Sequence, residues 1–314
     1  MHNPSAGNGS QLSADEIVEL IRDAGHKVKY QSSKEKKWQK ALKKKCDIVA
    51  VAGGDGTVGK VARRLIGSRT PIAVLPMGTA NNVGATLGIT ARPLPDIIRG
   101  WSAARGVSFD AGVAEGPWGS ECFIEGFGIG LFAESMLQLD EKENKHLTDS
   151  GETHEIIQSV LGILKQQLQR YQPKKMAVRL DGKDFSGDYL LLEALNIRYI
   201  GPNLDLVPRA DIKDGLLDVV FVTARERAKL SKRLGDLIKH KPTRPDLLVR
   251  RGRHLQIEWE NSPVHIDDRP WPEDDNKIHV RSNAIDVKIE PAALVFLVPA
   301  TKPRATKLRA AKAV

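Results

Sequence analysis

Residues 53–57 are Gly-Gly-Asp-Gly-Thr and combine three glycines with one carboxylate and one hydroxyl. The uncharged run 48–52 is typical of a strand buried on both faces, and residues 58–65 have a helical pattern. Glycines let a backbone approach a ligand closely, and the amides at a helix start bind anions. Asp55 can hold a metal ion between phosphate oxygens, and Thr57 can donate to one of them. The segment predicts a phosphate site, with a tight turn and a surface Asp as the alternative.

Two further loops have a similar composition. Residues 3–10 are rich in small residues and precede an amphipathic helical pattern at 17–21. Residues 71–76 have the apolar pattern of a strand and are followed by Gly, Thr and Asn at 77–82. Parallel strands bring their carboxyl ends to one edge of a sheet, where α/β folds bind their ligands. We therefore expect the three loops to lie side by side.

The order and spacing of these loops resemble the catalytic domain of bacterial diacylglycerol kinases, related lipid kinases and sphingosine kinases, which are distant relatives of NAD kinases. Asn196 and residues 208–219 are similar to the second-domain pattern of that family, and the resemblance extends to about Pro299. It implies a nucleotide site formed by Asn3, Ser5, Gly7, Ser33, Gly53, Gly54, Asp55, Gly56, Thr57, Val58, Gly59, Lys60, Thr79 and Asn81. Asn82 replaces an acid often found in the third loop and keeps a hydrogen-bonding amide.

Residues 210–216 are similar to the structural magnesium loop of the family. The resemblance implies that Asp214 binds Mg²⁺ through its carboxylate, and that Asp211 and Leu216 bind it through their carbonyls. Oxygen ligands suit this hard cation. The alternative is an ordinary Lys-Asp-Gly turn before a strand.

The proton acceptor is where this chain departs from the family. Its relatives carry Asp-Gly-Glu-Pro at the end of a late strand, with the Glu regarded as general base, whereas this chain has Asp267, Asp268, Arg269 and Pro270. Arginine stays protonated and offers no acceptor. Asp267 is our first candidate for the base and Asp268 the second, and Asp55 completes the predicted catalytic set. Alternatively, the protein binds nucleotide with weak or no kinase activity, and Arg269 clamps a phosphate.

The chain is expected to form two domains with the active site in the cleft between them. Residues 1–108, with the return of 287–300, form the nucleotide-binding α/β domain with a parallel sheet, as in NAD and diacylglycerol kinases. Residues 109–286 show short apolar runs between turns and predict a β-rich lipid-substrate domain. Residues 152–171 predict its clearest helix. Because Met1 and His2 alone precede the Asn-Pro motif, we expect a short first strand or a misplaced start site.

The net charge is +9, and five of these charges lie on a basic tail at 301–314 that has no acid. Such a tail either attracts anionic lipid headgroups or serves solubility. Nucleic-acid binding is not expected, because aromatic residues make up 5% of the chain and do not alternate with basic ones. The lysine-rich run 34–45 predicts the solvated face of a helix with Trp38 inside.

No apolar run approaches the ~20 residues of a membrane span, and no signal-peptide pattern is present. We therefore expect a cytoplasmic protein at the inner membrane face. The leading hypothesis is an ATP-dependent, Mg²⁺-requiring lipid kinase that phosphorylates a hydroxyl of diacylglycerol or a similar lipid. The alternatives are a soluble kinase like the NAD kinases and a non-catalytic nucleotide or lipid sensor. A homodimer is left open.

Overall fold

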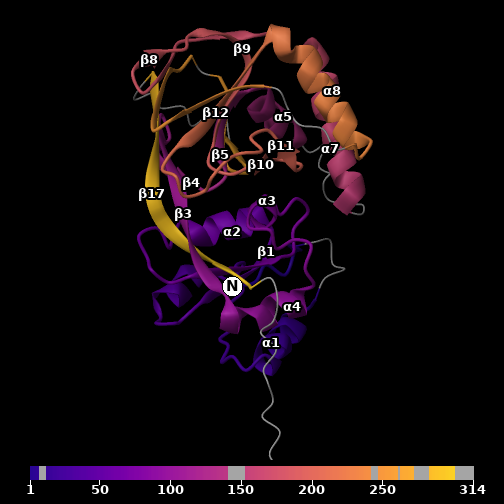
Figure 1. Ribbon diagram of the computed structural model, residues 1–314, viewed down its shortest axis with the longest axis vertical. Coiled ribbons are helices and arrows are strands. Elements are labelled where there is room, and N and C mark those ends of the chain that lie inside the picture. Colours follow the sequence, from indigo (N-terminus) through magenta and orange to yellow (C-terminus); the bar gives the residue numbers. More distant parts are fainter. Residues whose placement is uncertain (7–11, 141–152, 242–246, 261, 272–282, 301–314) are drawn as a thin grey trace, which may run out of the picture.

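The computed structural model of the protein describes residues 1–6, 12–140, 153–241, 247–260, 262–271 and 283–300. Figure 1 shows two stacked bodies, and two long strands run through both of them. These strands are β3 (Arg105–Gly116) and β17 (Ala284–Val298). The fold is therefore the expected α/β domain followed by a β-rich domain.

The first body alternates strands and helices. Its α1 helix begins at a capping box, in which the side chains of Ser13 and Glu16 each accept from the other's backbone, and it buries Ile17 and Ile21. Helix α1 is Ala14–Asp23. The other elements of the first body are the 3₁₀ helix Trp38–Lys43, β1 (Val49–Gly53), α2 (Asp55–Ala62), β2 (Ile72–Pro76), α3 (Asn82–Thr86), α4 (Leu94–Arg99) and the 3₁₀ helix Gly100–Ala103.

The parallel arrangement expected of this domain is present. Strand β1 pairs with β2 in parallel, from Val49 opposite Ile72 to Gly53 opposite Pro76. Phe296 of β17 continues the parallel pairing on the far side of β2. The loops that follow β1 and β2 therefore leave the sheet at the same edge.

The lysine-rich run differs from its prediction. It forms one short 3₁₀ helix, because Lys37 before it adopts a left-handed conformation with φ of 63° and Lys44 after it is extended. Trp38 is buried as expected, at 5% exposure.

The long strands β3 and β17 join the two bodies. They pair antiparallel along almost their whole length, with an irregularity between Glu290 and Leu294. Opposite this irregularity lies the buried carboxylate of Asp110, which accepts from the amides of Ala292 and Gly215, each at 2.7 Å. Strand β17 thus continues past this irregularity as one element from Ala284 to Val298. The domain boundaries predicted at 108–109 and 286–287 fall inside β3 and β17. The division of the chain into two domains at these positions stays a prediction.

The second body is a sandwich of β-sheets with helices on one side. Its elements are β4 (Gly119–Phe123), β5 (Gly126–Gly130), α5 (Leu131–Asp140), α7 (Thr153–Arg170), β6 (Lys174–Met176), β7 (Val178–Leu180), β8 (Lys183–Asp184), β9 (Gly187–Leu195), β10 (Tyr199–Ile200), β11 (Leu204–Asp205), β12 (Leu217–Thr223), the 3₁₀ helix Ala224–Glu226, α8 (Arg227–Ile238), β13 (Leu248–Gly252), β14 (His254–Glu258), β15 (Val264–Ile266) and β16 (Arg269–Trp271). One sheet has the order β13-β12-β9-β5-β15-β16, and β14, β7 and β8 extend the sheet that contains β17. The predicted helix at 152–171 corresponds to α7.

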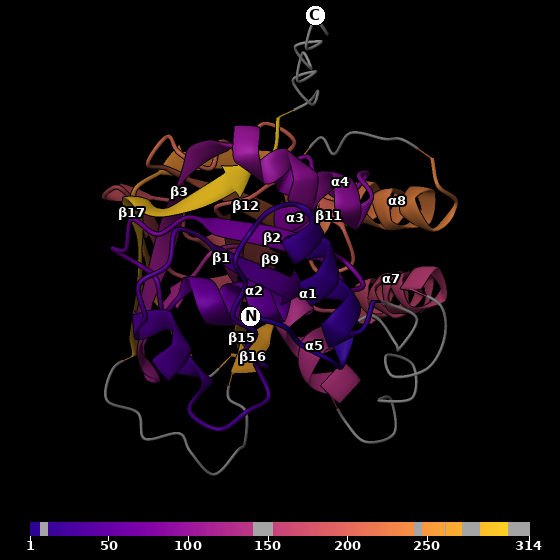
Figure 2. The same cartoon turned by 90° about the horizontal axis from the view of Figure 1, so that it is seen from below.

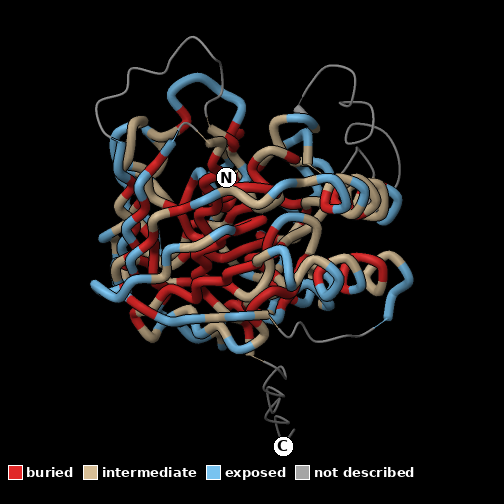
Figure 3. Tube along the Cα trace, turned by 90° about the horizontal axis from the view of Figure 1, so that it is seen from above, coloured by how far each residue is buried: buried red, intermediate tan, exposed pale blue. Residues whose placement is uncertain are grey.

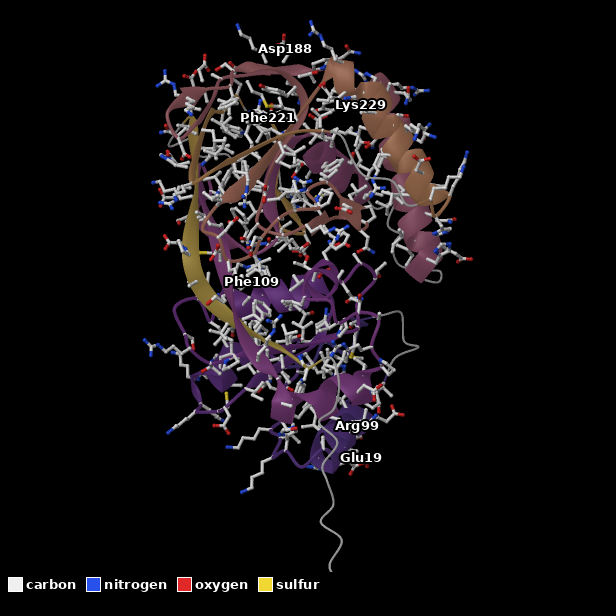
Figure 4. The ribbon with its side chains drawn as sticks, viewed as in Figure 1. Glu19, Arg99, Phe109, Asp188, Phe221 and Lys229 are labelled. Carbon is white, nitrogen blue, oxygen red and sulfur yellow. The ribbon has the colours of Figure 1, made fainter. Side chains whose placement is uncertain are left out.

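Buried residues run through the centre of both bodies (Figure 3). One core lies between the two sheets of the sandwich and includes Phe127 and Phe221, and another lies between β9, β12 and the helices α5, α7 and α8. Figure 2 shows α7 and α8 together on one flank. Phe109 lies where β3 passes from one body to the other and packs on Phe296 with ring centroids 4.6 Å apart (Figure 4). None of the helices in the described ranges is long and apolar enough to cross a membrane.

Candidate active site

The three predicted loops meet at one end of β1 and β2. The side-chain amide of Asn3 donates to Thr57 Oγ1 over 3.2 Å, so the first loop is tied to the second. Gly54 and Gly78 lie back to back, and a Cβ on Gly54 would come within 2.9 Å of Gly78 Cα. A side chain on Gly78 would overlap the Gly54 backbone even more severely. The second and third loops can therefore touch only because both positions are glycine.

These loops form one wall of a cavity of about 970 Å³ that lies between the two bodies. Its lining includes eight of the predicted nucleotide residues, namely Asn3, Ser5, Ser33, Gly54, Gly56, Thr57, Lys60 and Thr79. Gly53, Val58 and Gly59 lie just behind this wall in β1 and α2, and Gly7 is outside the described residues. The arrangement brings most of the predicted set together. Direct contact with a nucleotide stays a prediction for every member.

Asp55 and Asn81 hold the loops rather than line the cavity. The Asp55 carboxylate accepts from the amides of Asn82 and Val83, at 2.9 and 3.0 Å, and thereby fixes the start of α3 to the start of α2. Burial raises the pKa of Asp55, and the nearby charge of Asp268 contributes to the same shift. Asn81 is left-handed, with φ of 53°, and its side chain closes the third loop on the backbone of Gly78.

Asn82 connects the third loop to the second body. Its side-chain amide donates to Glu125 Oε2 and to the Gly201 carbonyl, both at 3.0 Å. Glu125 is buried, and burial raises its pKa well above the usual range, with the charge of Asp55 adding to the effect. The amide that replaces an acid in this loop thus serves as a donor, which a carboxylate could not do.

A cationic wall of the cavity escaped the sequence analysis. Lys34, Arg63 and Arg64 line it together with Lys60, whose ammonium lies 5.8 Å from the centre of the Trp38 ring. Lys60, Arg63 and Arg64 are spaced i, i+3 and i+4, which places them on one face of a helix and was an available signal. Their charges suit a ligand that carries phosphates.

Asp267 lies in the two-residue turn between β15 and β16, on the opposite wall. Its Oδ1 accepts from the amides of Ile124 and Glu125 at 3.0 and 2.8 Å, and its Oδ2 accepts from Arg63 at 2.6 Å. The residue is 5% exposed and has a left-handed φ of 54°. Burial raises the pKa of Asp267 to about 6, against the opposing effect of Arg63. Both oxygens therefore already accept hydrogen bonds from the protein.

The next two residues, Asp268 of the turn and Arg269 at the start of β16, face the cavity. Asp268 is exposed, and its carboxylate lies where a Cβ on Gly56 would be, over the first turn of α2. The Arg269 guanidinium donates to Glu121 Oε2 over 3.0 Å, and both residues line the cavity. The acid expected at position 269 is thus replaced by a cation that forms an ion pair with a carboxylate on β4.

The predicted magnesium loop has a different partner. The Asp214 carboxylate forms an ion pair with Arg251, which also lies 3.3 Å from Asp218. The second Asp214 oxygen accepts from the Leu216 amide, and the Asp211 carbonyl faces the Asp214 amide at 3.4 Å. A cation here would have to displace the guanidinium of Arg251, and Mg²⁺ binding by Asp211, Asp214 and Leu216 stays a prediction. The described residues form no group of three or more metal-binding side chains.

Comparison with known proteins places this geometry in a family. The model of the diacylglycerol kinase catalytic domain matches residues 1–109. The model of the YegS C-terminal NAD kinase beta sandwich-like domain matches residues 139–297, half of the chain. The chain belongs to the diacylglycerol kinase and YegS-like lipid kinase family. The resemblance carried by the three loops is thereby confirmed.

Named members of the family resemble the chain over most of its length. A diacylglycerol kinase of Mycobacterium tuberculosis is 24% identical over 283 residues, which cover 84% of this chain and 86% of the relative. A probable lipid kinase YegS-like of Stenotrophomonas maltophilia is 31% identical over 204 residues, 62% of this chain and 61% of the relative. The crystal structure of a diacylglycerol kinase from Bacillus anthracis superposes with a TM-score of 0.66 at 18% identity, covering 96% of this chain and 95% of that one. The last likeness concerns the fold alone.

Proposed function

We propose that the chain is an ATP-dependent lipid kinase that transfers the γ-phosphoryl group to a hydroxyl of diacylglycerol or a similar lipid. The observation that carries the proposal is the convergence of three small-residue loops and a cationic wall on one cavity. Membership of a kinase family supports a phosphotransferase. The names of the relatives support a lipid acceptor.

The first body would bind the phosphates. Backbone amides at the start of α2, from Gly54 to Thr57, lie at the positive end of the helix dipole and suit an anion. Lys60 and Arg64 add charge that offsets the repulsion between phosphate oxygens. The Lys60 ammonium lies over the face of the Trp38 ring, and this cation–π contact limits the positions that its charge can take.

Asp268 is the side chain we propose as proton acceptor from the lipid hydroxyl. A general base needs a free lone pair within reach of the substrate. The oxygens of Asp267 are taken by two amides and by Arg63, whereas Asp268 is exposed in the cavity next to the phosphate loop. Asp267 would then fix the turn that presents Asp268. This exchanges the order in which the sequence ranked the two residues.

Mg²⁺ would enter with the nucleotide and offset the charge of its phosphates. Magnesium usually binds through one or two carboxylates together with substrate phosphates and water. Asp55 would be such a carboxylate: burial raises its pKa, the nearby charge of Asp268 adds to the shift, and a bound cation would offset both effects. At the Asp214 loop, Mg²⁺ would first have to replace the guanidinium of Arg251.

The lipid substrate requires contact with a membrane surface, which we propose occurs at the inner face of the cell membrane. The five basic residues of 301–314, which lie outside the described residues, would attract anionic headgroups. Vesicle sedimentation at low and high salt tests this. Removal of 301–314 should weaken binding to anionic vesicles, and unchanged binding would assign the tail to solubility.

The test of the activity is transfer of label from γ-labelled ATP. Diacylglycerol and other lipid alcohols are offered in mixed micelles, and NAD is offered as a soluble acceptor. A labelled lipid supports the proposal, whereas labelled NAD would favour the soluble alternative. A second candidate function, a non-catalytic nucleotide sensor, is favoured by the Arg269–Glu121 pair in place of the family's acid. Tight nucleotide binding with no labelled product would support the sensor.

A further inference from the structure

Glu193 and His265 form a buried pair that the proposed chemistry does not use. Their side chains are 0% and 1% exposed, and His265 Nε2 lies 2.8 Å from Glu193 Oε2. Removing two ionisable groups from water is costly unless further hydrogen bonds hold them. His265 lies two residues before Asp267, the first residue of the turn that carries Asp268.

The two side chains meet across an intervening strand. In the sheet, His265 of β15 is opposite Gly128 of β5, and Gly128 is opposite Glu193 of β9. A Cβ on Gly128 would overlap both the Glu193 carboxylate and the His265 ring. Helix α5 packs over β5 and β15 and covers this part of the sheet. The pair therefore depends on a glycine in the middle strand, which supplies the space for the contact.

The other ring nitrogen reaches the turn. His265 Nδ1 lies 3.0 Å from the carbonyl oxygen of Asp267. Because a carbonyl can only accept, Nδ1 must carry a proton in this geometry, and Nε2 shares a second proton position with Glu193. Glu193 thus fixes the orientation of the imidazole, and the imidazole fixes the carbonyl of a residue in the left-handed region, with φ of 54°.

We infer that Glu193 and His265 are positioning residues: they hold the Asp267–Asp268 turn so that the Asp268 carboxylate stays over Gly56 in the cavity. The turn has three other supports, which are the Gly126 carbonyl, the amides of residues 124–125 and Arg63. His265 is the contact that acts on the carbonyl side of Asp267, directly before Asp268. The inference rests on the proposed function for the role of Asp268, but the contact itself does not.

Two matched substitutions of His265 each keep one of the two contacts of its ring and remove the other. The side-chain N–H of Asn lies close to the place of Nδ1, so His265→Asn keeps a donor for the Asp267 carbonyl. The longer side chain of Gln reaches the place of Nε2. His265→Gln therefore keeps the contact with residue 193 and loses the hydrogen bond to the Asp267 carbonyl. Both are made together with Glu193→Gln, so that neither leaves a buried carboxylate unpaired. Hydrogen exchange of the Glu125 and Asp267 amides reports on the turn, and kcat and KM report on catalysis.

With Asn at 265, exchange and kcat should stay within about twofold of Glu193→Gln alone. With Gln at 265, the loss of one hydrogen bond should speed exchange about tenfold and lower kcat about tenfold, with the KM for ATP unchanged. Equal effects of the two substitutions would overturn the inference. If either variant fails to fold, ¹⁵N NMR of the wild-type imidazole decides, because an Nδ1 without a proton contradicts the contact. If the wild type transfers no phosphate, the proposed function fails. The positioning of the turn is then tested by hydrogen exchange alone, compared between His265→Asn and His265→Gln.

Discussion

Arg63, the residue directly after α2, lies 2.6 Å from the Asp267 carboxylate of the β15–β16 turn, and this buried ion pair joins the two walls of the cavity. The exposed fractions are 14% for the Arg63 side chain and 2% for that of Asp267. Asp267 also accepts from amides of 124–125, so one carboxylate connects the first body, the β4–β5 loop and the catalytic turn. The geometry of the cleft therefore depends on it.

Arg63→Met should destabilise the protein by about 3 kcal/mol at pH 7, because it leaves a buried carboxylate without its cation. Urea unfolding measures the change. Arg99→Met is the matched control, since Arg99 pairs with Asp96 on the surface, where the two side chains are 65% and 54% exposed, and should cost less than about 0.5 kcal/mol. Similar losses in both variants would argue against the special role of Arg63.

Asp267 should give the stability of the protein a specific pH dependence. Its folded pKa is about 6, above the ordinary value of about 4, so the folded state keeps its proton to higher pH than the unfolded state. The associated stability is fully present below about pH 4 and is lost as the pH rises through 6. Relative to Asp267→Asn, which cannot titrate, the wild type should lose about 2 kcal/mol between pH 4 and 7. Parallel stability curves in urea unfolding would contradict the assignment.

Gly78→Ala should disrupt the contact between the second and third loops, because the added methyl overlaps the backbone of Gly54. We expect a loss of about 1–3 kcal/mol in urea unfolding together with weaker ATP binding by calorimetry. Gly162→Ala in α7 is the control, since a Cβ there meets no atom within 4 Å and alanine favours a helix by about 1 kcal/mol. A Gly78→Ala variant as stable as the wild type would show that the loops can separate without cost.

The ion pair between Asp214 and Arg251 predicts that chelation has little effect on stability. The melting temperature of the wild type should be the same in EDTA and in Mg²⁺, because a guanidinium already neutralises the carboxylate. Arg251→Ala removes that cation, so its melting temperature should rise when Mg²⁺ is added. A clear drop of the wild-type melting temperature in EDTA would instead support the magnesium loop implied by the family resemblance.

The sequence predicted that the three loops would lie together on one wall of the cavity, because the signals of these loops are local. Gly53, Gly54 and Gly56 lie at the end of one apolar strand and Gly78 lies two residues after the next, and the order of the loops along the chain matches their order at the sheet edge. The contacts of the opposite wall could not be predicted, because the residues that contact the β15–β16 hairpin are distant from it in sequence. Asp267 meets Arg63 across 204 residues, and Arg269 meets Glu121 across 148. Whether a carboxylate is open to substrate or held by amides depends on such contacts, so the observation behind our proposal of Asp268 over Asp267 was not available from the sequence.

The most direct test of the account is the kcat of Asp268→Asn for lipid phosphorylation, measured beside ATP affinity and beside Asp23→Asn, an exposed surface control on α1. Loss of a positioned base should lower kcat by about 10²–10⁴ and leave ATP affinity close to that of the wild type. Asp23→Asn should retain full activity. An Asp268→Asn variant that phosphorylates lipid at the wild-type rate would contradict the proposed site.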